Sequence, residues 1–252
     1  MIVLRSILFN LAFYVVSVLF TVLGSPLLFG PRSWAMAGLE AHGRTCIWLM
    51  RWIVGTRLEV RGRGKLPAGA ALIAAKHQSA WDTFGLVPVF RDPCFVLKAE
   101  LLLIPFYGWF CRKFEHIVVK REKPAAALRG LIRDAKAKAA QGRHIIIFPE
   151  GNRRAPGAPA DYKSGIVALY EALDAPCYPV ALNSGLFWPR RKFLRFPGKI
   201  IVEILDPIPP GLARAEFRKR LETAIEGATN RLIAEKGFSV ETDARAVLDK
   251  QA

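Results

Sequence analysis

The sequence predicts an α/β fold, in which a single domain with a mixed sheet flanked by helices follows a hydrophobic two-helix element. Short apolar runs that are typical of buried strands alternate along the chain with longer segments of helical periodicity. Polar clusters come directly after two of these runs, as they do at the ligand-binding edge of open α/β sheets. Near the N-terminus, residues 6–30 include no charged side chain.

The 25 residues from Ser6 to Gly30 are enough to cross a bilayer, since its core is about 30 Å thick and a helix rises about 1.5 Å per residue. Asn10 and the break at Gly24–Pro26 favour a helix that enters one leaflet over a single uninterrupted span. A secretory signal peptide is the alternative, because Arg5 supplies a positive start. The apolar stretch is longer than the roughly 7 to 15 residues usual in such signals.

A second helix is predicted from Trp34 to Val54, where Arg44 and Arg51 interrupt a mostly apolar pattern. Such a helix is typical of a membrane interface. We therefore expect residues 1–55 to associate with a membrane phospholipid surface. The composition agrees, since 52% of the 252 residues are hydrophobic.

Residues 56–237 are expected to form one domain, and residues 238–252 a mobile tail with weak patterning. Glycine and proline residues separate the apolar runs from the helical segments of this domain. Strands are predicted at 70–75, 144–148 and 199–205, and helices at 123–141, at 164–173 and along the apolar positions between 217 and 232.

A histidine and a carboxylate stand five residues apart after the first of these strands, as His77 and Asp82. Two residues at that spacing lie on different sides of a helix, so they can meet only if His77 precedes a turn. Ser79 is a suitable N-cap for a helix that begins near Ala80. The carboxylate would then fix the tautomer of the imidazole and leave Nε2 free as a base. The same spacing also fits a helix-capping Asp beside a strand-end His that bonds only to the backbone.

The strand at 144–148 leads into Pro149-Glu150-Gly151-Asn152-Arg153-Arg154. Gly151 permits a tight turn and the close approach of a ligand to the backbone. Arg153 and Arg154 can bind an anion through two parallel hydrogen bonds each, and a phosphate is the obvious candidate. The alternative is a surface loop with solvated arginines, which we favour for Arg154. Two polar clusters at equivalent strand ends predict one shared pocket.

These residues resemble the glycerophospholipid acyltransferases, in particular the 1-acyl-sn-glycerol-3-phosphate (lysophosphatidic acid) acyltransferase family. The family's pattern is Asn-His-x-x-x-x-Asp followed by Phe-Pro-Glu-Gly-Thr-Arg. Two more blocks fit in order, a strand that ends in arginine and a Pro-Val strand, so the likeness extends over residues 57–206. The four blocks stand here at 76–82, 116–121, 148–153 and 178–182.

The resemblance implies that His77 is the general base and Asp82 its partner. The chain departs from the family pattern at Lys76, which replaces Asn, and at Asn152, which replaces Thr. Lys76 would either tune the base or add to an anion-binding field, if its side chain is close to that of His77. By the same resemblance, the acceptor site around a 3-phosphate would include Lys98, Arg121, Glu150, Gly151 and Arg153.

The implied reaction is acyl transfer to lysophosphatidic acid, giving phosphatidic acid. His77 would deprotonate the sn-2 hydroxyl, which then attacks an acyl thioester carried by coenzyme A or acyl carrier protein. No enzyme nucleophile is needed, because Ser79 lacks a Gly-x-Ser-x-Gly setting. The alternatives are a related acyltransferase with another acceptor (glycerol 3-phosphate, a lysophospholipid or a lyso-aminolipid), an esterase, or a non-catalytic basic binding protein.

The net charge of +16 fits either anionic lipid or nucleic acid as a partner. Basic and aromatic residues alternate at 187–196, which suits a membrane interface, stacking on single-stranded bases, or a loop whose aromatics fold back on the core. The apolar N-terminus favours the membrane, so we expect no nucleic acid to bind.

The four cysteines have no Cys-x-x-Cys spacing, and we interpret them as packing residues of a protein from a reducing compartment. The histidines show no ligand-type spacing, so neither a metal nor any other cofactor is expected. We expect a membrane location with the active site on the cytoplasmic face, as on a bacterial inner membrane.

Overall fold

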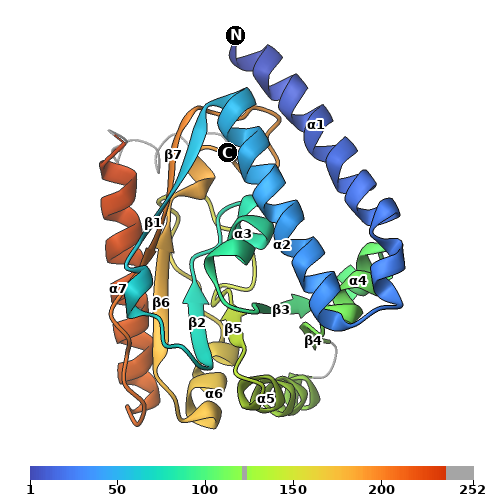
Figure 1. The fold of residues 1–252 in the computed structure, drawn as a ribbon. Helices are drawn as coiled ribbons and strands as arrows, with labels where there is room; N and C mark the ends of the chain where they lie inside the picture. The colour runs from blue at the N-terminus through green and yellow to red at the C-terminus, as the bar shows by residue number, and fades with distance from the viewer. Residues whose placement is uncertain (121–123, 237–252) are drawn as a thin grey trace.

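The computed structural model describes residues 1–120 and 124–236, which form an α/β fold around one seven-stranded sheet (Figure 1). The strand order is β1-β7-β6-β2-β5-β3-β4, and every neighbouring pair is parallel except β6 and β7. The sheet is therefore mixed, as the sequence predicts, with β1 and β7 opposed to the other five strands. The strands are β1 (Thr56–Arg61), β2 (Ala71–Ala75), β3 (Cys94–Lys98), β4 (Ile117–Val119), β5 (His144–Ile147), β6 (Cys177–Leu182) and β7 (Gly198–Ile204).

Helices flank the sheet on both faces, and the predicted helices of the domain are all present (Figure 1). Those predicted at 123–141 and 164–173 form as α5 and α6. Residue 123 lies outside the described residues, and residue 141 lies in the turn after α5. The helices are α1 (Ile2–Leu23), α2 (Arg32–Leu49), α3 (Trp81–Gly85), α4 (Tyr107–Lys113), α5 (Pro124–Ala140), α6 (Ser164–Leu173) and α7 (Arg214–Ala234).

Strand β2 shows how the side chains divide between the two faces. Leu72 and Ala74 pack in the core beneath α5, α6 and α7, whereas Ile73 and Ala75 pack in the core beneath α1, α2 and α3. All five residues of β2 are buried, which explains why the strand is an unbroken apolar run. Because side chains alternate, consecutive residues after the strand point to opposite faces of the sheet.

The N-terminal part forms a helical hairpin. Helix α1 ends at Leu23, and a short 3-10 turn at Ser25–Leu28 reverses the chain, as the predicted break requires. The second helix begins at Arg32 and continues past Leu49 into one π-helical turn, Met50–Val54. Gly55 then closes this turn with a φ of 88°, which favours glycine.

Among the described residues, one helix, α1, is long and apolar enough to cross a membrane by length and composition. Only 11% of its most apolar window is buried, which sets α1 apart from the core helix of a soluble protein. Its inner side packs on the domain, where Phe9 meets the Trp188 ring edge-on at 5.3 Å. Ser6 accepts a hydrogen bond from the backbone N–H of Arg195 at 2.9 Å.

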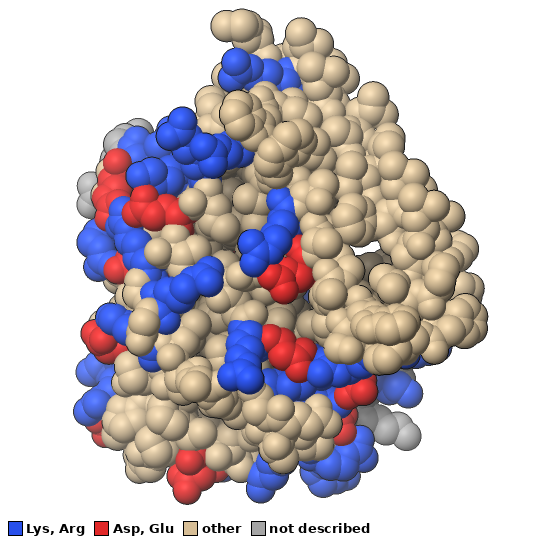
Figure 2. Space-filling view, in the orientation of Figure 1, with Lys and Arg blue, Asp and Glu red and all other residues tan. Residues whose placement is uncertain are grey.

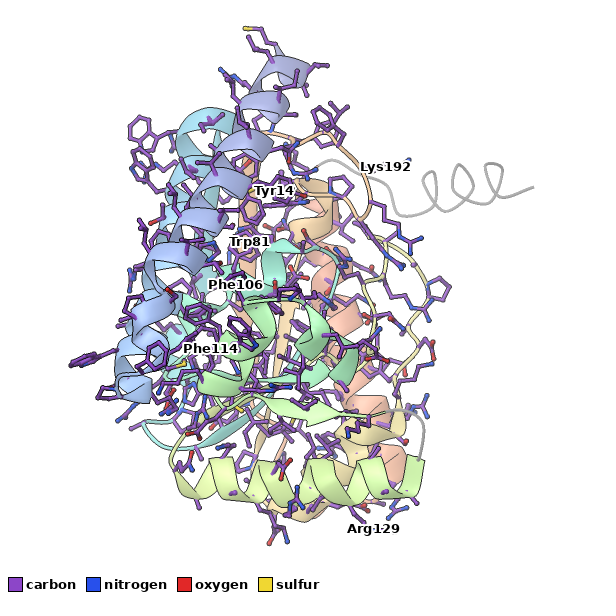
Figure 3. All side chains as sticks on the ribbon, turned by 90° about the vertical axis from the view of Figure 1, so that its right-hand side faces the viewer. Tyr14, Trp81, Phe106, Phe114, Arg129 and Lys192 are labelled. Carbon is purple, nitrogen blue, oxygen red and sulfur yellow. The ribbon has the colours of Figure 1, made fainter. Side chains whose placement is uncertain are left out.

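The surface over α1 is mostly neutral, while charged side chains of both signs, with lysine and arginine in excess, are spread over the rest of the view (Figure 2). Helix α2 carries charge as well, in the exposed ion pair between Glu40 and Arg44. Exposed apolar residues of α1, α2 and the segment around α4 form this surface. Tyr14 and Phe106 mark it in the side-on view (Figure 3). We call it the apolar face; it includes Leu11, Tyr14, Val18, Trp34, Trp48, Trp52, Leu103, Phe106 and Trp109.

The basic and aromatic loop at 187–196 divides into a buried base and an exposed tip. Phe187 and Trp188 are buried, and the guanidinium of Arg195 lies 4.4 Å from the Trp188 ring centre. Phe193 at the tip is 52% exposed. The alternative in which the aromatics fold back on the core is thus correct for Phe187 and Trp188 and wrong for Phe193.

Candidate active site

His77 and Asp82 meet, as the sequence predicts. After β2 the chain turns, and the His77 Nδ1–H donates to Asp82 Oδ2 at 2.9 Å. The same oxygen accepts the backbone N–H groups of Gln78 and Ser79 at 2.8 Å and 2.9 Å. Asp82 therefore pairs with His77 and also caps the backbone, because one carboxylate oxygen accepts all three hydrogen bonds. Hydrogen bonds from two amides and the imidazole compensate the complete burial of this carboxylate.

The predicted cap at Ser79 is one residue early. Helix α3 begins at Trp81, so Ala80 is the capping position and it offers no side-chain hydrogen bond. The Ser79 hydroxyl still satisfies one backbone donor of the first turn, since it accepts a hydrogen bond from the Trp81 N–H at 3.1 Å. Asp82 lies in the first turn as expected, where the helix dipole favours negative charge.

Ser184 is a member of the site that the sequence reasoning missed. Its hydroxyl donates to the second oxygen of Asp82, Oδ1, at 2.5 Å. Next to it, the Gly185 N–H donates to the side-chain oxygen of Gln78 at 3.0 Å. Ser184 follows β6, which is parallel to β2, so it stands at the same sheet edge as His77. A polar pair directly after a buried strand, Asn183-Ser184, was the available signal.

The imidazole of His77 packs against a neighbouring ring on one face and remains partly accessible to solvent. Its ring stacks on that of Phe148 with the centres 3.9 Å apart and the planes at 15°. The side chain is 12% exposed. Because the carboxylate of Asp82 can only accept, Nδ1 carries the proton and Nε2 is the unprotonated nitrogen. Within the described residues, Nε2 has no hydrogen-bond partner, which is what a general base requires.

The loop at 149–154 lies beside His77. The Arg154 N–H donates to the His77 carbonyl oxygen at 2.8 Å, so the two polar segments are joined through their backbones. Gly151 has a φ of 63°, in the left-handed region that favours glycine. This contact places both predicted clusters at one edge of the sheet.

The basic residues predicted around a phosphate have different surroundings. Lys98, at the end of β3, reaches this loop and donates to the Asn152 side-chain oxygen at 2.6 Å. Arg153 is half-buried, and its carbonyl accepts a hydrogen bond from Arg190 at 3.0 Å. Arg154 pairs with Asp161 instead, and its Nε is buried without a hydrogen-bond partner in the described residues, so it is not the solvated arginine that was favoured. Arg121 lies outside the described residues.

Glu150 and Lys76 lie inside the protein. Glu150 is 1% exposed and Lys76 is 2% exposed, and the Lys76 Nζ donates to Glu150 Oε1 at 2.9 Å. Burial raises the pKa of Glu150, although Lys76 opposes that rise. Lys76 has the strand parity of Leu72 and Ala74, and it points to the face opposite His77. The expectation that Lys76 adds charge beside the base is therefore wrong.

All four cysteines are buried free thiols, as packing residues should be. In residues 1–120 and 124–236, no group of three or more His, Cys, Asp or Glu side chains is placed to hold a metal ion.

Comparison with known proteins gives one family. A family model described as Acyltransferase matches residues 57–183, just over half of the chain. A 1-acyl-sn-glycerol-3-phosphate acyltransferase of Pseudomonas aeruginosa is 38% identical over 161 residues, which are 64% of this chain and 63% of that protein. A Saccharomyces cerevisiae protein of the same name is 29% identical over 81% of this chain and 68% of its own length.

A third relative of that name, from Limnanthes alba, is 29% identical over 66% of this chain and 60% of its own. The matched segments thus span less than two thirds of the Pseudomonas and Limnanthes proteins. The crystal structure of the 1-acyl-sn-glycerophosphate (LPA) acyltransferase from Thermotoga maritima superposes with a TM-score of 0.78 at 23% identity, over 93% of this chain and 98% of that one. This likeness shows a shared fold. Since the family model covers the His77–Asp82 pair and the loop at 149–154, the chain belongs to the acyltransferase family.

Proposed function

We propose that the protein transfers a fatty acyl group from an acyl thioester to the sn-2 hydroxyl of 1-acyl-sn-glycerol 3-phosphate, forming phosphatidic acid. The observation that carries the proposal is the His77–Asp82 pair, whose buried carboxylate fixes the proton on Nδ1 and leaves Nε2 open at a sheet edge. The names of the relatives support lysophosphatidic acid as the acceptor.

The reaction proceeds by direct attack. His77 Nε2 takes the proton of the sn-2 hydroxyl as its oxygen bonds to the thioester carbonyl carbon, and the carbonyl oxygen becomes an oxyanion. Asp82 stabilises the imidazolium that forms. The tetrahedral intermediate then expels the thiolate, which takes the proton back from His77. The products are phosphatidic acid and a free thiol, and the enzyme ends in its starting protonation state.

The acceptor phosphate is assigned to Lys98 and Arg153 at the same sheet edge and, by the resemblance to the family pattern alone, to Arg121. Lys98 is positioned for this role through its contact with the loop at Asn152. Gly151 allows the loop backbone to approach a ligand closely. Glu150 contributes indirectly, by supporting the loop, because its carboxylate is buried against Lys76 and does not face the solvent.

The apolar face is assigned to the membrane phospholipid surface. Its exposed tryptophans, Trp34, Trp48 and Trp52, are the side chains that favour the boundary between lipid and water. Helix α1 then enters the bilayer from the side on which the catalytic domain lies. We assign that side to the cytoplasm, where coenzyme A or acyl carrier protein would deliver the acyl group.

The direct test is thiol release from acyl-coenzyme A by the detergent-solubilised protein, with and without lysophosphatidic acid. His77→Ala should abolish acceptor-dependent release. Thr83→Ala, an exposed change in the same short helix as Asp82, is the matched control and should release thiol like the wild type. Release without any acceptor would indicate a thioesterase. Release with glycerol 3-phosphate alone would assign another acceptor to the same chemistry.

A further inference from the structure

A buried cluster of ionisable side chains lies on the far face of the sheet from His77. The Lys76 Nζ donates to Glu150 Oε1 at 2.9 Å and to both carboxylate oxygens of Glu226 at 2.8 Å. The Tyr162 hydroxyl donates to Glu226 Oε1 at 2.9 Å. The Lys76 and Glu150 side chains are 2% and 1% exposed, and that of Glu226 is 20% exposed. We call these four residues the ionic brace.

The members of the ionic brace come from separate parts of the chain. Lys76 is the residue before the proposed base, and Glu150 lies in the turn that leads to Gly151 and Arg153. Glu226 belongs to α7, and Tyr162 to the segment before α6. The lysine therefore links the end of β2, the turn after β5 and the helix that covers this face.

Such a cluster is costly for stability, because its charges must leave water. Two carboxylates share one ammonium group, and the second oxygen of Glu150 has no hydrogen-bond partner in the described residues. A well-packed apolar set would serve stability as well or better. What charges provide instead is a defined position for the segments that carry them, since each bond has a fixed length and direction.

The ionic brace positions the loop at 149–154, whereas the His77–Asp82 pair is held by other hydrogen bonds. Asp82 is held by Ser184 and by two backbone N–H groups, and within the described residues none of these groups is hydrogen-bonded to a side chain of the ionic brace. Glu150, in contrast, is directly bonded to Lys76 and is covalently part of the loop. A change in the brace should therefore move the loop at 149–154 more than the His77–Asp82 pair, which is joined to the loop through the Arg154 N–H bond to the His77 carbonyl.

We propose that Lys76 and Glu226 are positioning residues, which hold Glu150 and through it the loop at 149–154 in the conformation that binds the acceptor phosphate. The proposal rests on the proposed function for the identity of the acceptor. It predicts a split in the kinetic constants. Loss of the brace should raise the KM for lysophosphatidic acid about tenfold, the effect of a displacement of a fraction of an ångström. The kcat and the KM for the acyl thioester should stay within about threefold of wild type, since the reacting groups remain in place.

The main variant is Glu226→Gln, which keeps the shape and can still accept from Tyr162 but loses the charge that faces Lys76. Its matched control is Glu222→Gln, which removes the same charge one turn earlier on α7. Within the described residues, the Glu222 side chain makes no hydrogen bond or ion pair. Lys76→Met is the second single variant, and the double variant completes a cycle. If the two residues act as one unit, the double variant should raise the KM for the acceptor no more than Lys76→Met alone.

A second readout does not depend on turnover. Amide hydrogen exchange of the segment 149–154 should speed up in Glu226→Gln and stay at the wild-type rate in Glu222→Gln. A wild type that acylates no acceptor would refute the proposed function, and hydrogen exchange would still decide whether the brace holds the loop. Unchanged exchange and an unchanged acceptor KM in Glu226→Gln would overturn the positioning role. A fall in kcat without a rise in acceptor KM would overturn it as well.

Discussion

Replacement of Asp82 by asparagine should slow acyl transfer about a thousandfold and leave the fold intact. The side-chain oxygen of asparagine can still accept the N–H groups of Gln78 and Ser79 and the proton of His77 Nδ1. Its NH2 group would face the Ser184 hydroxyl, which can accept a hydrogen bond as well as donate one. The substitution therefore removes the charge and little else.

The magnitude follows from the distance between the partners. A contact of 2.9 Å between Nδ1 and Oδ2 puts the two delocalised charges about 4 Å apart once the imidazolium forms, which is worth about 4 kcal/mol at an effective dielectric constant of about 20. In the ground state the imidazole is neutral and is not attracted in this way, so the loss falls on the transition state. About 4 kcal/mol corresponds to a factor of about 10³ in rate.

The assay is the initial rate of thiol release at saturating lysophosphatidic acid, together with the Tm of each variant. Asp82→Asn should keep a Tm within a few degrees of wild type and an acceptor KM within about threefold. A kcat within tenfold of wild type would refute the reasoning, because the carboxylate would then serve only to cap the backbone. Asp82→Ala distinguishes the two roles, since it removes the cap as well and should lower the Tm.

Three further predictions concern the support of the site, the stability of the domain and the membrane contact. Ser184→Ala removes one hydrogen bond to the Asp82 carboxylate, so kcat should fall about tenfold to a hundredfold, by the roughly 1.5 to 3 kcal/mol of a hydrogen bond to a charged group, and Ser184→Thr should restore it. Burial lowers the pKa of His116 to about 3, so the histidine stays neutral in the fold and gains its proton only on unfolding. The free energy of unfolding should therefore drop as the pH falls below about 6.5, by about 2 kcal/mol at pH 5, and urea titrations should show a smaller drop for His116→Gln. Leu11→Asp puts a charge on the exposed side of α1, and it should reduce co-sedimentation with phospholipid vesicles while thiol release in detergent stays at the wild-type level.

The sequence predicted those features that depend on neighbouring residues. The strand β2, the turn after it and the bond between His77 and Asp82 are all contained within a dozen positions, so strand and helix geometry settle them. The same holds for the break after α1, where Gly24 and Pro26 stop the helix.

Contacts between distant segments were not predictable. Ser184 lies 102 residues from Asp82, and Glu226 lies 150 residues from Lys76, so only the folded sheet brings these pairs together. The direction of the Lys76 side chain is a different case. The alternation along β2 already places it opposite His77, and the sequence interpretation went wrong by treating the two neighbours as one patch.

The basic residues at this site come from separate segments of the chain. Lys98 and the loop at Asn152 are in contact, as a shared site requires. Arg121 and the tail expected at 238–252 lie outside the described residues. The part of the apolar face on α1 could be predicted, because it appears in the sequence as an uncharged stretch. Its extension to Phe106 and Trp109 could not, because only the fold brings those residues beside α1.

The central claim is acyl transfer to the sn-2 hydroxyl of lysophosphatidic acid with His77 as the base, and analysis of the lipid product tests it most directly. The protein would be incubated with 1-acyl-sn-glycerol 3-phosphate and an isotopically labelled acyl-coenzyme A, and the product digested with a phospholipase specific for the sn-2 ester. The account predicts labelled phosphatidic acid whose label is released entirely from sn-2, and none from His77→Gln. Labelled free fatty acid in place of phosphatidic acid, or labelled product formed equally well by His77→Gln, would contradict it.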